Sequence, residues 1–128
     1  MSDRITLGDV IATREFRVTR PQATRVVLLI GKPKRLDSGD TYYCPYQITG
    51  TGDEKVRYAA GIDAVQSLQL AMGLIGADLA ALDRASTGTL RWVLGREGGK
   101  EIAEKKGEYG VPGIEWLASR RGQKRRPK

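Results

Sequence analysis

Histidine is absent from this chain, and cysteine occurs only once, at Cys44. Without histidine, the chain cannot build a Ser-His-Asp or Cys-His catalytic arrangement from its own residues. A zinc cage of cysteine and histidine ligands is excluded for the same reason. A single cysteine cannot form a disulfide within the chain, which is typical of proteins in a reducing compartment. We therefore expect a cytoplasmic protein that is not an enzyme and that holds no metal or cofactor.

We expect no signal peptide at the start of this sequence. The first ten residues, MSDRITLGDV, lack the positively charged start and apolar core of a signal peptide. The longest apolar stretch, GIDAVQSLQLAMGLIGADLAAL at residues 61–82, is long enough to span a membrane. Glutamine, serine and aspartate side chains spread through that stretch argue against insertion, so we expect no membrane partner.

The formal net charge of +7 is concentrated at one end of the sequence. Residues 119–128, SRRGQKRRPK, hold six of the 22 basic residues and none of the 15 acidic ones, which leaves the rest of the chain at +1. The length of 128 residues fits one domain of ordinary size. We expect a single domain over residues 1–118 without a basic surface of its own, followed by a disordered basic tail over 119–128.

Four short strands are predicted in the first half of the chain. Residues 9–20 alternate apolar and polar side chains except at Arg14, and five consecutive apolar residues at 26–30 indicate a strand that is central or covered on both faces. A third strand at 41–48 contains Pro45, which favours an edge position or a bulge. A fourth strand covers 55–61. No connection is long enough for a crossover helix, so we expect an antiparallel meander.

One long helix is predicted next. Asp63 is a suitable N-cap, and Gln66 completes a capping-box pattern. Large side chains spaced by three or four residues form a stripe that should pack on the sheet: Val65, Leu68, Met72, Ile75, Leu79 and Leu82. A second stripe on nearly the opposite side needs another cover, and it consists of Leu70, Leu74, Ala77 and Ala81.

The cover of the second stripe has two candidates. One is the C-terminal part of the chain, which we favour and which offers Leu90, Trp92, Val93, Leu94, Ile114, Trp116 and Leu117. The other is a partner, most simply a second copy of the helix across a two-fold axis. The charged, glycine-rich residues 95–110 are expected to form a loop with a short helix in KEIAEKKGE. The expected fold is therefore α+β, with a four-stranded antiparallel meander packed against one long helix and an irregular C-terminal segment.

No motif in the sequence carries a chemical activity. GREGGKE has only three residues between its outer glycines and lacks the hydroxyl residue that a phosphate loop requires. We expect a non-catalytic binding module whose partner is another protein or a second copy of itself. A regulatory or toxin-neutralising role fits by analogy of size and architecture alone.

The alternative is a nucleic-acid-binding accessory protein. Its basic tail would contact phosphates, and a tyrosine on an outer sheet face would stack on bases. Tyr42, Tyr46 and Tyr58 are expected to point inward, which leaves Tyr43 as the stacking residue. The candidate contacts are Tyr43, Arg57, Lys32, Lys34, Arg35, Arg120, Arg121, Lys124, Arg125 and Arg126.

Three blocks of the sequence are similar to a known family. YYCPYQITG at 42–50, GIDAVQSLQLAMGLIGADL at 61–79 and LRWVLG at 90–95 resemble a small bacterial domain family of unknown function, over roughly residues 10–117. The clearest part is a strand end, a capped helix start and a packing stripe, formed by Gly61, Asp63, Ala64, Gln66, Leu68, Leu70 and Ala71. The resemblance therefore implies a fold and brings no catalytic residue.

Overall fold

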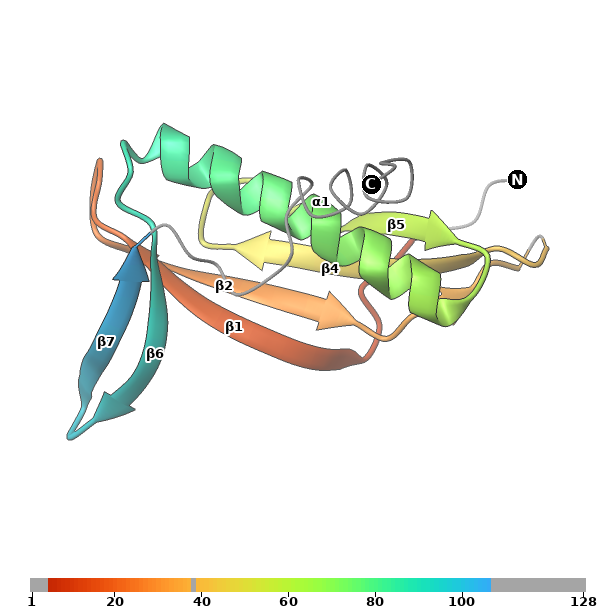
Figure 1. Ribbon diagram of the computed structural model, residues 1–128, viewed down its shortest axis with the longest axis horizontal. Coiled ribbons are helices and arrows are strands. Elements are labelled where there is room, and N and C mark those ends of the chain that lie inside the picture. The colour runs from red at the N-terminus through yellow and green to blue at the C-terminus, as the bar shows by residue number, and fades with distance from the viewer. Residues whose placement is uncertain (1–4, 38, 107–128) are drawn as a thin grey trace, which may run out of the picture.

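The strands form one antiparallel sheet, and a single helix packs on one of its faces (Figure 1). The computed structural model describes residues 5–37 and 39–106. The strands of this part are β1 (Val10–Val18), β2 (Thr24–Gly31), β3 (Lys34–Arg35), β4 (Tyr42–Thr49), β5 (Arg57–Gly61), β6 (Arg91–Glu97) and β7 (Lys100–Lys106). The predicted α+β class with an antiparallel sheet is confirmed. The predicted number of four strands is wrong, because the sheet contains seven.

The order of strands differs from a simple meander at both ends of the sheet. β2 lies between β4 and β1, as its apolar run predicts, and β6 follows β1 on the far side. Tyr42 and Tyr43 pair with both β3 and β5, and Tyr46 pairs with both β2 and β5. β2 and β3 therefore share one edge of β4, and β5 occupies the other edge.

Pro45 does not mark an edge strand, which was one of the two alternatives predicted for it. It lies within β4, between the segments paired with β2 and with β3, and is fully buried. Proline has no backbone N–H to donate to a neighbouring strand. This is tolerated at Pro45 because it faces the break between β2 and β3, at Gly31–Pro33. Gly31 makes room for the ring, because a Cβ on Gly31 would lie 2.8 Å from Cγ of Pro45. Around Pro45, β4 is thus paired with described strands on both edges.

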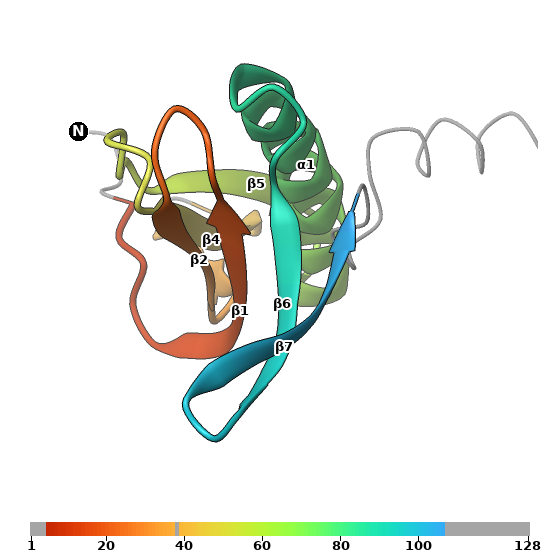
Figure 2. The same cartoon turned by 90° about the vertical axis from the view of Figure 1, so that its left-hand side faces the viewer.

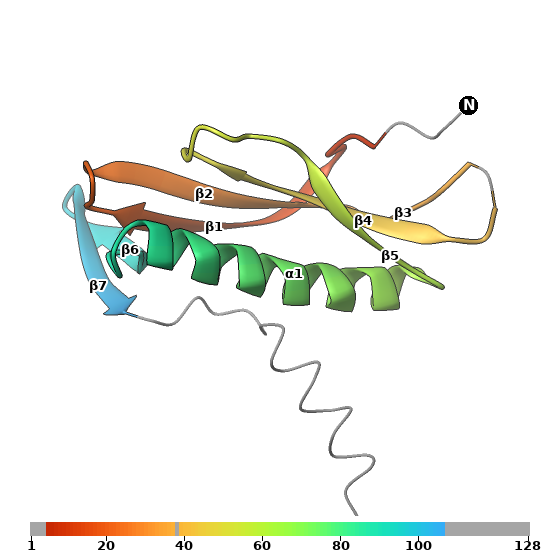
Figure 3. The ribbon, with the colours of Figure 1, turned by 90° about the horizontal axis from the view of Figure 1, so that it is seen from above.

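The helix α1 (Ala64–Ala85) begins where the sequence predicts. The Asp63 carboxylate accepts a hydrogen bond of 2.8 Å from the backbone N of Gln66, and Oε1 of Gln66 accepts one of 2.8 Å from the backbone N of Ile62. By length and composition α1 is apolar enough to cross a membrane, but core helices pass the same test. Here α1 runs along the sheet for its whole length (Figure 3).

The face of α1 that meets the sheet is rotated from the predicted stripe. Ile75 and Leu79 are fully buried as expected, whereas Val65 is 65% exposed. The first turns instead bury small side chains, Ser67 and Ala71. The cause is Gly61, where an added Cβ would lie 2.7 Å from the backbone N of Ser67. The helix start thus lies directly against β5, and this close approach turns Val65 toward solvent.

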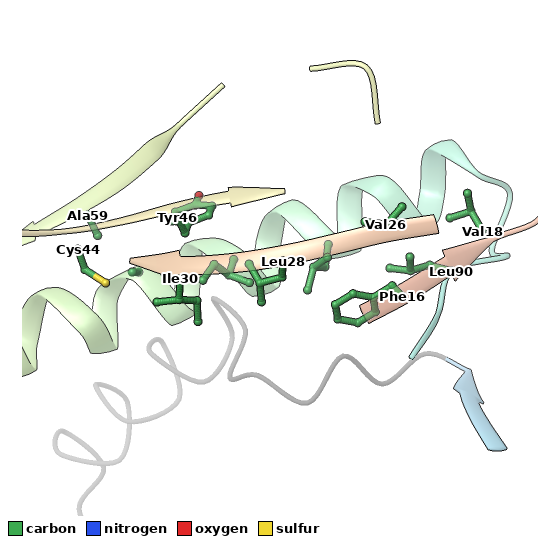
Figure 4. Packing of buried hydrophobic residues seen from close by; sticks show 12 residues of the cluster. Phe16, Val18, Val26, Leu28, Ile30, Cys44, Tyr46, Ala59 and Leu90 are labelled. Atoms are coloured by element: carbon green, nitrogen blue, oxygen red, sulfur yellow. The ribbon is translucent and has the colours of Figure 1, made fainter. Parts of the chain in front are cut away.

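The core lies between α1 and the sheet (Figure 4). Its largest fully buried side chains include Phe16 of β1, Leu28 of β2 and Tyr46 of β4. Leu90, at the end of the α1–β6 connection, is also fully buried in this cluster, and Trp92 packs against it. The prediction that these two residues cover the back of the helix is therefore wrong, since they belong to the sheet side. Of the other residues predicted for that cover, Val93 is buried and Leu94 is exposed, both on β6, while Ile114, Trp116 and Leu117 lie outside the described part of the chain.

Residues 91–106 form a β-hairpin and not the predicted loop with a short helix. Gly98 and Gly99 form its turn with φ values of 59° and 83°, which glycine adopts without strain. Only two pairs join the hairpin to the rest of the sheet, Phe16 with Trp92 and Arg17 with Arg91. Beyond those pairs the hairpin extends away from the helix and the other strands (Figure 2).

Candidate functional site

The predicted nucleic-acid face around Tyr43 does not form. Tyr43 lies on the sheet face away from α1, as predicted, but is only 6% exposed, so its ring offers no stacking surface. Its neighbour there is Tyr58, whose ring centroid is 6.2 Å away in an edge-to-face arrangement. Arg57 lies on the opposite face, beside Tyr46, and pairs with Asp53 at 3.2 Å. The prediction that Tyr58 points inward is also wrong, because it is 46% exposed.

The remaining predicted nucleic-acid contacts fall into two groups, of which the structure describes one. Lys32, Lys34 and Arg35 are exposed around the break between β2 and β3. Arg35 donates to the carbonyl of Gly39 at 3.1 Å and to Asp40 at 3.4 Å, so acceptors already engage its guanidinium. The tail candidates Arg120, Arg121, Lys124, Arg125 and Arg126 lie outside the residues that the structure describes.

The predicted partner face on α1 is divided between different surroundings. Leu70 is half-buried and packs against the core, while Leu74 is exposed. Ala77 is half-buried, and Ala81 is exposed beside a cavity of about 200 Å³ that Asp53, Arg57 and Asp78 also line. These four residues therefore do not form one face opposite the sheet.

A hydrogen-bonded pair links α1 to β4 beside this cavity. The hydroxyl of Tyr46 donates to Oδ2 of Asp78 at 2.6 Å. Burial raises the pKa of the Tyr46 phenol well above its usual value, and the hydrogen bond and charge of Asp78 act in the same direction, while Arg57 opposes them. A phenol held protonated in this way is a poor proton shuttle near neutral pH. The pair therefore acts as a tie between helix and sheet.

Cys44 is fully buried in the core and lies 3.7 Å from the carbonyl of Gly31. Burial raises the pKa of its thiol from 9.0 to about 11. Since the thiolate is the reactive form, this environment suits a packed side chain and not a nucleophile. Within residues 5–37 and 39–106, no cluster of three or more carboxylate or cysteine side chains could hold a metal ion.

The sequence patterns did not predict the apolar surface at the edge of the sheet. β5 pairs with β4 alone among the described strands, so its other edge is not covered by any of them. Tyr58 and Ala60 share one side of β5, and Ile62, the residue that follows the strand, is 77% exposed. Val65, in the first turn of α1, is also exposed. We call Tyr58, Ala60, Ile62 and Val65 the β5 edge surface.

Comparison with protein families assigns the chain. A family model described as a domain of unknown function, DUF6968, matches residues 12–102, which is more than half of the chain. The chain belongs to the DUF6968 family. The match includes every strand that lies next to α1 and ends within β7, so the DUF6968 unit comprises the sheet and helix described above. No curated protein and no solved structure matches the chain.

Membership in DUF6968 agrees with the resemblance inferred from the sequence blocks. The helix start that carries that resemblance, from Gly61 to Ala71, lies within the matched range and forms the closest helix–sheet contact. These residues are accounted for by packing and capping. Family membership therefore describes a fold, and the function must be argued from the surfaces of the chain.

Proposed function

We propose that this DUF6968 chain is a non-catalytic protein-binding module, and that a partner protein adds an extended strand to β5. The β5 edge surface carries the proposal. A sheet edge presents backbone N–H and C=O groups that can pair with another chain, and proteins that avoid such pairing place lysine, proline or a bulge there. β5 begins with the charged Arg57, which pairs with Asp53, and its remaining residues Tyr58–Gly61 contain no charged residue, proline or bulge.

The side chains of the surface also suit recognition by strand addition. In this mode backbone hydrogen bonds give affinity, and alternate side chains give specificity. Tyr58 lies on one side of β5 with Ala60, exposed Ile62 follows the strand, and the edge-to-face contact with buried Tyr43 holds the Tyr58 ring. Tyrosine is enriched at protein interfaces because its ring combines apolar area with few rotatable bonds.

Non-catalytic function is supported by the chemistry of the described residues. The chain has no histidine. Its one cysteine is buried with a raised pKa, and the Tyr46–Asp78 pair is engaged in a structural hydrogen bond. A second copy of the chain is one partner that the β5 edge could accept, and a different protein is the other. The regulatory or toxin-neutralising type remains an analogy of architecture.

The experiment uses Val65→Asp, because a carboxylate in the first helical turn interacts favourably with the helix dipole and should not unfold the protein. Ile11→Asp is the matched control, since Ile11 is also an exposed aliphatic residue and lies on β1, away from β5. Proteins captured from cell extract by the wild-type chain and both variants would be quantified by mass spectrometry. Light scattering would give the mass of each protein in solution.

The proposal expects a partner that the wild-type chain and Ile11→Asp retain equally and that Val65→Asp loses at least tenfold. A second copy as the partner would appear as a two-chain mass that falls to one chain only in Val65→Asp. Equal capture and equal mass for all three proteins would show that the β5 edge surface is not the binding site.

A further inference from the structure

A cavity of about 420 Å³ opens at the end of the molecule where α1 terminates. Three parts of the chain meet there, namely the turn between β1 and β2, the loop between β4 and β5, and the last turn of α1 (Figure 1). Pockets that bind small molecules begin at about 300 Å³ and combine apolar walls with a few polar groups. The size of this cavity therefore suits a small ligand, and the chemistry of its walls decides which kind.

The inner wall of the cavity is apolar. Val18 and Val26, from β1 and β2, are both buried members of the core. Leu82 packs against the same core from α1, and Ala85 continues the wall to the surface. We call Val18, Val26, Leu82 and Ala85 the inner wall. A polar group placed against it would lose its hydrogen bonds to water, so the part of a ligand that enters must be apolar.

The rim of the cavity carries a positive charge. Of the described residues that line the cavity, Arg20 alone is charged. Arg20 is exposed, and no carboxylate within residues 5–37 and 39–106 pairs with its guanidinium. A guanidinium presents a planar fork of donors that matches a carboxylate. The cavity thus combines an apolar wall with a group that binds one anion.

Hydrogen bonds fix the position of Arg20 beside the helix end. The backbone N–H groups of Thr19 and Arg20 both donate to Oγ1 of Thr89, each at 3.3 Å. This hydroxyl in turn donates to the carbonyl of Ser86, the C-cap of α1, at 2.8 Å. Ser86 itself lines the cavity, so one threonine ties two of its walls together. A ligand then enters a site whose walls are already ordered, which lowers the entropic cost of binding.

We propose that this cavity binds a small monocarboxylate with an apolar body, whose carboxylate pairs with Arg20 while the body packs on the inner wall. One guanidinium matches one negative charge, whereas a phosphate monoester carries close to two and would require further donors. The cavity lies by the last turn of α1, and Val65 of the β5 edge surface lies in the first. The site is therefore independent of the proposed function.

The test compares two probes of the same shape, naphthylacetate and its neutral amide, naphthylacetamide. Their binding to the full chain at pH 7 would be followed by heteronuclear NMR titration, which gives both the dissociation constant and the place of binding. Arg20→Gln removes the charge at the rim, and this change at an exposed residue should leave the fold intact. Arg84→Gln is the matched control, because Arg84 is an exposed arginine beside Ala85 that does not line the cavity. Thermal midpoints would confirm that both variants are folded.

We expect the wild-type chain and Arg84→Gln to bind naphthylacetate about tenfold more tightly than the amide, as a hydrogen-bonded ion pair implies. Arg20→Gln should bind both probes equally, and the backbone signals of Gly50, Gly52 and Ser86 should shift on binding. A tenfold preference that persists in Arg20→Gln, or shifts confined to other parts of the chain, would overturn the proposal. So would displacement of the probe by an equal concentration of inorganic phosphate, or the absence of saturable shifts up to about 10 mM naphthylacetate.

Discussion

Replacing Tyr46 by phenylalanine would remove one hydroxyl from the boundary between α1 and β4. The ring would stay packed in the core, where Tyr46 is one of the largest fully buried side chains. The hydroxyl is the donor to Asp78, at 2.6 Å. Tyr46→Phe therefore tests the hydrogen bond between helix and sheet separately from the apolar packing around it.

The structure sets the expected magnitude. A hydrogen bond to a charged group contributes about 1.5–3 kcal/mol, and loss of the donor leaves the acceptor to be solvated another way. Asp78 lines the 200 Å³ cavity, which gives its carboxylate access to water. We therefore expect a loss at the low end of that range, about 1.5–2 kcal/mol. With a urea slope of about 1.5–2 kcal/mol/M, the unfolding midpoint should fall by about 1 M.

The assay is urea unfolding followed by tryptophan fluorescence and circular dichroism at pH 7. Tyr58→Phe is the matched control, because that ring is half exposed and its loss of a hydroxyl should change the free energy of unfolding by less than about 0.5 kcal/mol. A double-mutant cycle with Asp78→Ala should give a coupling energy of at least about 1 kcal/mol. A Tyr46→Phe loss no larger than that of the control would refute the assignment of this pair as a structural tie.

Three further predictions concern the packing around the helix. Gly61→Ala should cost about 1–3 kcal/mol of unfolding free energy in a denaturant titration, because its Cβ would meet the backbone of Ser67, whereas Gly39→Ala has open space and should be nearly neutral. Asp63→Ala should lower the free energy of unfolding by about 1 kcal/mol through loss of the helix cap, and a thermal midpoint within 1 °C of the wild type would contradict this. Since burial raises the pKa of Cys44 to about 11, the folded state favours the protonated thiol. The protonated thiol therefore contributes to the free energy of unfolding below pH 9, and this contribution is lost as the pH rises toward 11. Cys44→Ala should flatten the decline in the free energy of unfolding at alkaline pH. An unchanged pH profile would argue against the raised pKa of Cys44.

The first half of the fold was predictable because local patterns agree with tertiary packing there. The apolar run in β2 indicates a strand inside the sheet, and the Asp63–Gln66 capping pattern places the helix start correctly. The orientation of the helix was not predictable from the size of its side chains. Ser67 and Ala71 are buried because Gly61 permits a close approach, and this contact exists only in the folded chain.

The hairpin at residues 91–106 was missed because its charges suggested a helix. Glu101 and Lys105 are four apart, which is the spacing of a helical ion pair. In the structure, residues 96 and 97 are instead the register partners of residues 101 and 100, so this segment is the second strand of a hairpin. The two adjacent glycines at the turn, 98 and 99, were the signal that could have identified a hairpin.

The surface proposed for binding could not be read from the sequence. The β5 edge surface depends on β5 being the last strand on its side of the described sheet, which strand patterns do not reveal.

The position of β6 has a consequence for how the protein is made. β1 is synthesised early, yet its second neighbour is β6, which leaves the ribosome only after the whole helix. Until then, a nascent chain with β2, β4 and β5 in place has an incomplete edge at β1, which is the kind of surface that pairs with other unfinished chains. The Phe16–Trp92 pairing completes this edge last, so removal of the hairpin should favour aggregation during synthesis more than it weakens the finished core.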